Sequence, residues 1–368
     1  MKALITVTSL LLIIVFLSGC LGSSNSSTAP TLAFMYVVGT GDNGIRGLAE
    51  KSTGDLAPLA VASFATNPRP VSLALHPSKN FLYVPNLTSN TVSGFTVDHV
   101  NGILTPIGTA LPPTPVQTAP VAAGINSTGT FLYVLNQGSA SISAFSIDTA
   151  RGLLTAIGSP VATAANPQSM AVSPTAGFLY VGNGALGTIS GFAIAANGTL
   201  SPVAGSPFTA GAGATLAGIT IDPKGQFLYA ADSANSKIAS FSISGTGTLT
   251  AVAGSPFTTG TTPVSIAIDS TASFLYSANQ GSNNVSAFKI SAGSLTQITG
   301  SPYTLVTTGT PQPSFLTVDV SNTFLYVANV GTTNISAFGI KAADGSLSLL
   351  PNSPFPQGVA PLWIVTTQ

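Results

Sequence analysis

A seven-fold internal repeat dominates this sequence. The string Phe-Leu-Tyr-Val, or a close variant, recurs every 47 to 50 residues, with its tyrosines at Tyr36, Tyr83, Tyr133, Tyr180, Tyr229, Tyr276 and Tyr326. Seven of the eight tyrosines in the chain lie in this one column. A fixed period of this length is typical of repeat architectures, in which each unit buries its faces against its neighbours. The chain is therefore predicted to fold as one array of seven units.

Each repeat contains four short segments with strand character. In the third full repeat they cover about 169–172, 178–181, 188–194 and 199–203, and turn-forming residues separate them. No stretch of the mature chain shows a sustained helical period. Four strands in a repeat of this length are typical of a propeller blade. The predicted fold class is all-β, a seven-bladed β-propeller with four-stranded antiparallel blades.

The two ends of the repeat array complement each other. The first repeat opens at Phe34 with what is the second strand elsewhere, so it lacks a first strand. Residues 361–365 align with the first strands at 70–75, 263–268 and 313–318. We therefore predict that the C-terminal strand pairs into the N-terminal blade, which closes the ring and removes two exposed sheet edges.

The N-terminus has the features of a bacterial export signal. Lys2 precedes an apolar run over 3–16, which is shorter than the about 20 residues that a membrane-spanning helix needs. The run ends in Leu-Ser-Gly-Cys, which resembles a lipobox, and Cys20 is the one cysteine of the chain. In a lipobox the cysteine is lipidated and becomes the first residue of the mature protein. The alternative is a spare cysteine in an ordinary signal peptide.

This interpretation divides the chain into three parts. Residues 1–19 are predicted to be a lipoprotein signal peptide, 20–31 the lipidated cysteine with a flexible tether, and 32–368 the propeller. Acyl chains on Cys20 would hold an otherwise soluble domain at a membrane. The predicted location is the bacterial cell envelope, on a periplasmic, outer-membrane or extracellular face.

The chain is nearly uncharged. Charged residues make up 5% of the sequence, against a usual level of about 25%. Loss of Lys2 with the signal leaves a net charge of 9 − 10 = −1. Without a basic field to attract phosphates, nucleic acid is a poor partner. The hydrophobic content of 45% argues against disorder.

We also expect the propeller to be monomeric.

Four residues stand out from the repeat and are candidates for ligand binding. Arg69 precedes an inner strand where the other repeats carry neutral residues, and a guanidinium at the channel mouth could hold a carboxylate or phosphate. His76 replaces Asn, Ser or Asp at a turn, Asp232 breaks a column of asparagines, and Trp363 is the one tryptophan. The alternatives are an exposed arginine, a turn-capping histidine, a local turn or ion pair for Asp232, and packing for Trp363.

Motifs for metals and cofactors are missing from the sequence. The two histidines, His76 and His99, occupy different places in their repeats, so a shared metal site is not expected. Residues 39–44 match G-x-G-x-x-G after a strand. A dinucleotide site also needs a following helix, and none is predicted here, so we interpret this segment as a hairpin. No metal and no cofactor are predicted.

The repeats also resemble a known family. The Phe-Leu-Tyr-Val-x-Asn strings, the turns at His76-Pro77 and Asp222-Pro223, and residues 358–365 resemble the lactonase-type propellers of the YVTN and 6-phosphogluconolactonase group, over about residues 34–367. The resemblance implies, for members that process lactones, a cluster of His, Arg and Glu near the central channel. A base there activates water and a cation stabilises the oxyanion.

The inner strands favour a different function. None of those at 120–125, 167–172 and 216–221 carries His or Arg. We therefore favour an envelope-anchored or secreted binding scaffold for a glycan, small molecule or protein, because neutral polar side chains bind hydroxyls at low desolvation cost. The alternative is a diverged lactonase, a hydrolase of sugar lactones in which Arg69, His76 or Asp232 acts.

Overall fold

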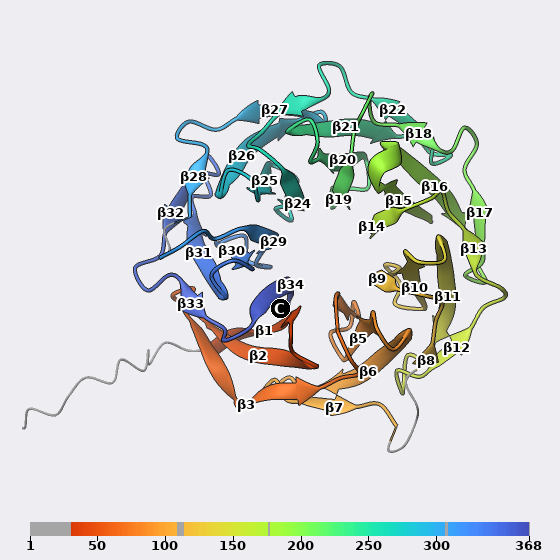
Figure 1. Cartoon of the computed structure of the whole chain (residues 1–368), viewed down its shortest axis with the longest axis horizontal. Helices are drawn as coiled ribbons and strands as arrows, with labels where there is room; N and C mark the ends of the chain where they lie inside the picture. The colour runs from red at the N-terminus through yellow and green to blue at the C-terminus, as the bar shows by residue number, and fades with distance from the viewer. Residues whose placement is uncertain (1–30, 109–113, 176, 306–307, 368) are drawn as a thin grey trace, which may run out of the picture.

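Seven antiparallel sheets surround a central axis like the blades of a propeller (Figure 1). The computed structural model describes residues 31–108, 114–175, 177–305 and 308–367. The predicted fold class is confirmed. Cys20 and the predicted signal peptide lie outside the described residues.

Each blade follows one path from the channel outward. The innermost strands are β34 (Ala360–Thr366), β4 (Ala74–Leu75), β9 (Pro120–Ile125), β14 (Pro167–Val172), β19 (Leu216–Ile221), β24 (Pro263–Ile268) and β29 (Pro313–Val318). The second strands, which carry the tyrosines, are β1 (Thr31–Thr40), β5 (Phe81–Asn86), β10 (Phe131–Asn136), β15 (Phe178–Asn183), β20 (Phe227–Asp232), β25 (Phe274–Asn279) and β30 (Phe324–Asn329).

The two outer strands complete each path. The third strands are β2 (Gly44–Lys51), β6 (Thr91–Val97), β11 (Ser141–Ile147), β16 (Thr188–Ile194), β21 (Lys237–Ile243), β26 (Asn284–Ser291) and β31 (Asn334–Ile340). The fourth strands are β3 (Leu56–Ala65), β7 (Leu104–Pro106), β12 (Leu154–Ala156), β17 (Leu200–Pro202), β22 (Leu249–Ala251), β27 (Ser294–Gln297) and β32 (Leu347–Leu349).

Six of the blades also carry a short fifth strand that the sequence pattern did not predict. It lies in the connector to the next blade and pairs with the third strand, off the main path. These strands are β8 (Thr114–Pro115), β13 (Val161–Ala162), β18 (Phe208–Thr209), β23 (Phe257–Thr258), β28 (Tyr303–Thr304) and β33 (Phe355–Pro356). Two residues are too few to show a period of two, which is why pattern analysis misses them.

Helix contributes almost nothing to the described residues. A single 3-10 turn, η1 (Gly184–Leu186), lies between β15 and β16. Within the described residues, no helix has the length and apolar character needed to cross a membrane.

The core lies between the blades, where the tyrosine column is fully buried. Tyr133, for example, donates its hydroxyl hydrogen to the carbonyl oxygen of Gly198 in the next blade, at 3.0 Å. Gly198 has φ +82°, and a Cβ on it would collide with the ring of Phe131. Equivalent bonds join Tyr36 to Gly102, Tyr83 to Gly152, Tyr180 to Gly247, Tyr276 to Gly345 and Tyr326 to Gly54. The repeat thus latches each blade to its neighbour.

The ring closes as predicted. β34 pairs antiparallel with β1, so that Val365 lies opposite Tyr36 and Trp363 opposite Val38. The N–H of Phe34 also donates to the hydroxyl of Thr367 at 2.9 Å. The C-terminal strand therefore supplies the inner strand of the N-terminal blade, beside the C label near the axis in Figure 1.

Candidate functional site

A cavity of about 690 Å³ lies on the axis of the ring. Five inner strands line it, namely β14, β19, β24, β29 and β34, and Figure 1 shows these strands facing the centre of the ring. Its volume lies within the range of about 300 to 1,000 Å³ that is usual for small-molecule sites. The cavity is the candidate functional site.

One position of the inner strands shapes the cavity. In six blades this residue, which is the fourth of β34 and the third of the other five strands, pairs with the second residue after the repeat tyrosine. In the remaining blade, Ser72 has the same place in the repeat but precedes β4. Two adjacent blades place Phe315 and Trp363 there, with ring centroids 4.2 Å apart and planes at 27°. The other blades place Ser72, Ala122, Ser169, Gly218 and Ser265 at this position. One side of the cavity is therefore an aromatic wall, and small residues keep the opposite side open.

The lining of the cavity carries no charged side chain among the described residues. Its polar side-chain groups are hydroxyls, one carboxamide and the indole N–H of Trp363. Ser314 donates to the carbonyl of Pro361 at 2.8 Å, and Ser265 accepts a long bond from the N–H of Leu316 at 3.4 Å. Ser169 has no hydrogen bond for its hydroxyl in the described part of the chain. Such a lining suits an uncharged ligand, because it offers a buried charge no partner.

Arg69 lies outside this cavity. Its side chain is exposed, and neither of the two ion pairs found among the described residues includes it. Its backbone N–H donates to Asn43 Oδ1 at 3.1 Å. Its φ of 61° places it in the left-handed region. The residues at the same position in four other blades share this conformation: Ala119, Asn166, Thr262 and Gln312. The backbone geometry at Arg69 thus belongs to the repeat.

His76 is buried at the turn after β4 and both its ring nitrogens are engaged. Nδ1 accepts the N–H of Ser78 at 3.1 Å, so the proton lies on Nε2, which is 2.8 Å from the carbonyl oxygen of Gly129 in the next blade. The ring also packs edge-on against Phe81, with centroids 5.6 Å apart. In this geometry His76 caps its turn and links two blades.

Asp232 is also buried and bound by local donors. Oδ1 accepts the backbone N–H of Thr215 at 3.0 Å and that of Asn235 at 3.2 Å, and Oδ2 accepts the Asn235 side-chain amide at 2.7 Å. Lys237 lies across the strand pair, but the two make no ion pair among those found in the described residues. Of the four predicted ligand residues, Trp363 lines the axial cavity, and the structure does not bring the other three to it.

Glu50 is an unusual residue that the repeat pattern alone did not single out as a candidate. This carboxyl is 2% exposed, and its Oε1 accepts the hydroxyl of Tyr326 at 3.1 Å, while Oε2 has no partner among the described residues. Burial raises the pKa of Glu50 to about 7, with Asp319 adding to the effect and the Tyr326 bond opposing it. The sequence does distinguish Glu50, because the equivalent position in the other six repeats is always Val or Ile. These residues are Val97, Ile147, Ile194, Ile243, Ile290 and Ile340.

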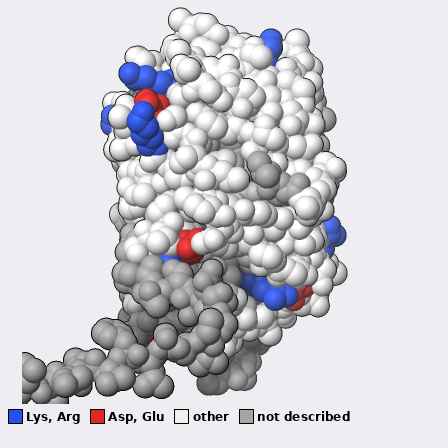
Figure 2. Space-filling model, turned by 90° about the vertical axis from the view of Figure 1, so that its left-hand side faces the viewer, with Lys and Arg blue, Asp and Glu red and all other residues white. Residues whose placement is uncertain are grey.

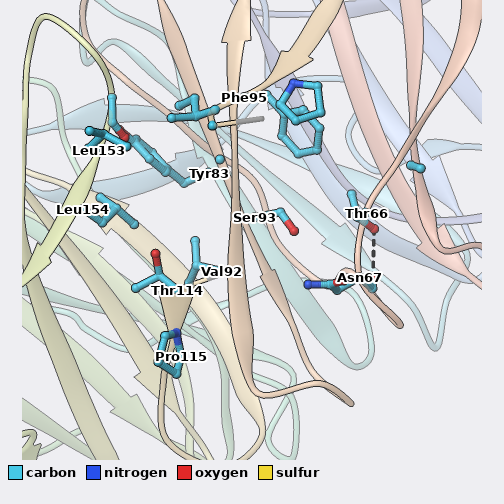
Figure 3. A pocket seen from close by; sticks show the side chains of 16 residues that line it. Thr66, Asn67, Tyr83, Val92, Ser93, Phe95, Thr114, Pro115, Leu153 and Leu154 are labelled. Atoms are coloured by element: carbon cyan, nitrogen blue, oxygen red, sulfur yellow. Dashed lines mark hydrogen bonds between the residues drawn. The ribbon is translucent and has the colours of Figure 1, made fainter. Parts of the chain in front are cut away.

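A second cavity, of about 480 Å³, follows the outer strand β6 (Figure 3). Tyr83, Phe95 and Leu154 are among its lining residues, and it is bordered by Gly108 and Thr114. These two residues flank 109–113, which lie outside the described residues. No function is assigned to this cavity.

Charges are sparse on the molecular surface. Figure 2 shows one face, on which Lys, Arg, Asp and Glu form a few small, separate groups on an otherwise uncharged surface. Arg46 pairs with Asp42 at 3.0 Å and Lys341 with Asp344 at 2.7 Å. No group of three or more potential metal ligands occurs in the parts of the chain that are described.

Comparison with known proteins gives the propeller a family. The sequence model of the family described as "Lactonase, 7-bladed beta-propeller" matches residues 26–213 and 203–304. These segments together cover more than half of the chain. The chain belongs to this family. No curated protein matches it by sequence.

Solved structures agree with the family at the level of the fold. A Bacteroides fragilis protein described as a "putative 6-phosphogluconolactonase" superposes with a TM-score of 0.77 at 21% identity, over 94% of this chain and 100% of that one. A protein from Bacteroides uniformis with the same description gives 0.77 at 17%, over 91% and 99%. The periplasmic gluconolactonase of Pseudomonas aeruginosa gives 0.76 at 16% identity, over 91% and 99%. At these identities the likeness shows a common propeller architecture.

Proposed function

We propose that this protein is a lactonase-type hydrolase of small, uncharged lactones, which it takes into the axial cavity. The observation that carries the proposal is an uncharged cavity of suitable volume on the axis of a lactonase-family propeller. The three structures compared above, whose descriptions name gluconolactone or 6-phosphogluconolactone chemistry, support the choice of a lactone.

The absence of charge from the lining separates neutral from phosphorylated substrates. A phosphate or carboxylate buried without a cation loses its hydration and gains no partner, which is strongly unfavourable. A neutral lactone ring has no charge to desolvate when it enters the cavity. We therefore expect an unphosphorylated lactone to be preferred over a lactone phosphate.

Ring opening by water requires donors for the carbonyl oxygen and a proton acceptor for the water. Gln168 and Thr220 line the cavity and can donate, whereas the hydroxyl of Ser169 is buried. The described lining contains no imidazole or carboxylate. This observation favours a second candidate function, in which the propeller binds the lactone without opening it.

One experiment separates the two functions. The purified protein is given D-glucono-1,5-lactone, its 6-phosphate and δ-octalactone, with turnover followed by acid release at constant pH. Binding is followed through the fluorescence of Trp363, the one tryptophan. Hydrolysis of a neutral lactone above the uncatalysed rate supports the hydrolase, and saturable fluorescence change without hydrolysis supports the binding protein. Preference for the phosphate, or no effect of any lactone on either signal, would refute the proposal.

We also propose that the protein acts at the cell envelope, anchored through acyl chains on Cys20. Stable anchoring requires more than one lipid chain or signal, as a lipoprotein cysteine would supply. Expressed in a bacterium, the full chain is expected in the membrane fraction and its Cys20→Ala variant is expected to leave that fraction. An unchanged distribution of the variant argues against the anchor.

A further inference from the structure

We infer that the axial cavity recognises a hydrophobic substituent, so that its ligand is an uncharged lactone bearing an alkyl chain. The lactone part rests on the proposed function, whereas the alkyl part rests on the walls of the cavity. Sugar lactones, which are covered with hydroxyl groups, would then be poor ligands.

The walls are mainly apolar. Met170, Val172, Ile219, Ile266, Phe315 and Trp363 all line the cavity. Five of them, Met170, Val172, Ile219, Phe315 and Trp363, are only half-buried, so they contact water in the free protein. A ligand that covers this surface with methylene groups gains affinity from the water it displaces.

The polar groups of the lining are too few for a sugar. The hydroxyl of Ser314 is already committed to the carbonyl of Pro361, and that of Ser265 lies against the N–H of Leu316. A sugar ring would bring several hydroxyls that must leave water, and each one without a partner weakens binding. The lactone carbonyl needs one or two donors, which Gln168 and Thr220 can supply.

The aromatic wall faces a space that the fold keeps open. Phe315 and Trp363 stack on each other on adjacent blades. At Gly218, which also lines the cavity, a Cβ would lie 2.6 Å from the carbonyl oxygen of Val264. Gly218 thus stays small because β19 packs closely against β24, and it adds no side chain to the lining of the cavity.

The test is a homologous series. δ-Hexalactone, δ-octalactone and δ-decalactone carry the same ring and differ by two methylenes per step, and their dissociation constants are measured through Trp363 fluorescence. Each buried methylene is worth about fourfold in affinity, so we expect about fifteenfold tighter binding per step of two methylenes. D-Glucono-1,5-lactone should bind more weakly than δ-octalactone.

Two variants locate the effect. Phe315→Ala removes half of the aromatic wall and keeps the Trp363 reporter, and it should weaken δ-decalactone more than tenfold while reducing the dependence on chain length. Phe257→Ala makes the same change on β23 in the outer part of a blade and should leave affinity unchanged. Melting curves of both variants check folding, and if Phe315→Ala unfolds, the chain-length series on the unaltered protein decides alone.

Affinity that does not vary along the series, or tighter binding of the sugar lactone, would overturn the inference. The proposed function fails separately. If alkyl lactones bind with the expected dependence but none is opened, the inference stands and the hydrolase is wrong. If lactones are opened without any dependence of affinity on chain length, the hydrolase stands and the inference of an alkyl-binding site is wrong.

Discussion

Each repeat tyrosine carries a polar hydroxyl into a core that water does not reach. A buried donor without a partner is costly, and in six blades a glycine carbonyl of the next blade accepts it. Burial raises the pKa of these tyrosines well above the usual range. The tyrosines therefore act as neutral donors, which explains why phenylalanine does not replace them in this column.

Tyr229 is the one repeat tyrosine whose hydroxyl does not bond to a glycine carbonyl of the next blade, so it provides a matched control for the other six. Ser240 donates to the carbonyl of Gly293 at 2.7 Å, and the Tyr229 hydroxyl has no well-formed hydrogen bond in the described residues. The sequence contains the signal, because the Ser240 column otherwise holds only Gly and Ala. The serine has taken over the role of the tyrosine in this blade.

This difference gives the first prediction. Tyr133→Phe removes the bond to Gly198 and leaves a buried carbonyl unpaired, so it should lower the free energy of unfolding by about 1 to 2 kcal/mol. Tyr229→Phe removes no such bond and should change it by less than about 0.5 kcal/mol. Denaturant titration of both variants measures the two values. Equal losses would show that the latch does not contribute as described.

At the scale of the element, sequence periodicity located strands better than it located connectors. In the repeat around Tyr180, the predicted segments 178–181 and 188–194 correspond to β15 (Phe178–Asn183) and β16 (Thr188–Ile194). These strands are long enough to show alternation, and they pack on both sides. The fifth strand of that blade, β18 (Phe208–Thr209), is held by two pairings with β16, and a pairing set by tertiary contact leaves no period in the sequence.

Glu50 makes one interface between elements sensitive to pH. It lies in β2 of the first blade, faces Tyr326 in β30 of the last blade, and senses the charge of Asp319. All other repeats have a branched aliphatic residue at this position. Because burial disfavours its ionised form, the folded protein holds this proton until about pH 7, while an ordinary glutamate releases it near 4.5.

The second prediction follows from that difference. Between about pH 4.5 and 7 the folded state binds more protons than the unfolded state, so stability falls as pH rises, by at most about 3 kcal/mol, and the loss is complete above pH 7. Glu50→Gln keeps an acceptor for Tyr326 and cannot ionise, so it should remove this component. Unfolding free energies of both proteins from pH 4.5 to 8 provide the measurement. A constant difference between the two curves would contradict the prediction.

At the scale of the whole molecule, the number of blades, their order and the closure could all be predicted, because each depends on a repeated pattern of many residues. The site could not be predicted in the same way. Arg69, His76 and Asp232 were singled out because each breaks a column, and Trp363 because it is the one tryptophan, but a column can break for packing reasons. His76 and Asp232 bind neighbouring backbone groups. The axial cavity arises from small residues opposite Phe315 and Trp363, and that arrangement appears only once the ring is closed.

The closure itself supports a third prediction. A chain ending at Val359 lacks β34, so β1 becomes an exposed edge and the first and last blades separate on one side. We expect this chain to melt at a markedly lower temperature than the full protein. A synthetic peptide of residues 360–368 should restore the transition by adding the missing strand in trans.

The peptide reports its own binding. It carries the one tryptophan, Trp363, so the truncated chain contributes no tryptophan emission and the anisotropy of the peptide gives the affinity directly. Ile364 is 1% exposed and packs in the core between the first and last blades. A peptide with Ile364→Lys would bury an unpaired charge there and should neither bind nor restore the melting transition.

If both peptides bind equally, or if the truncated chain melts like the full protein, β34 does not hold the ring closed. The first and last blades must then be kept together by their packed core and by the latch from Tyr326 to Gly54, both of which the truncation leaves in place.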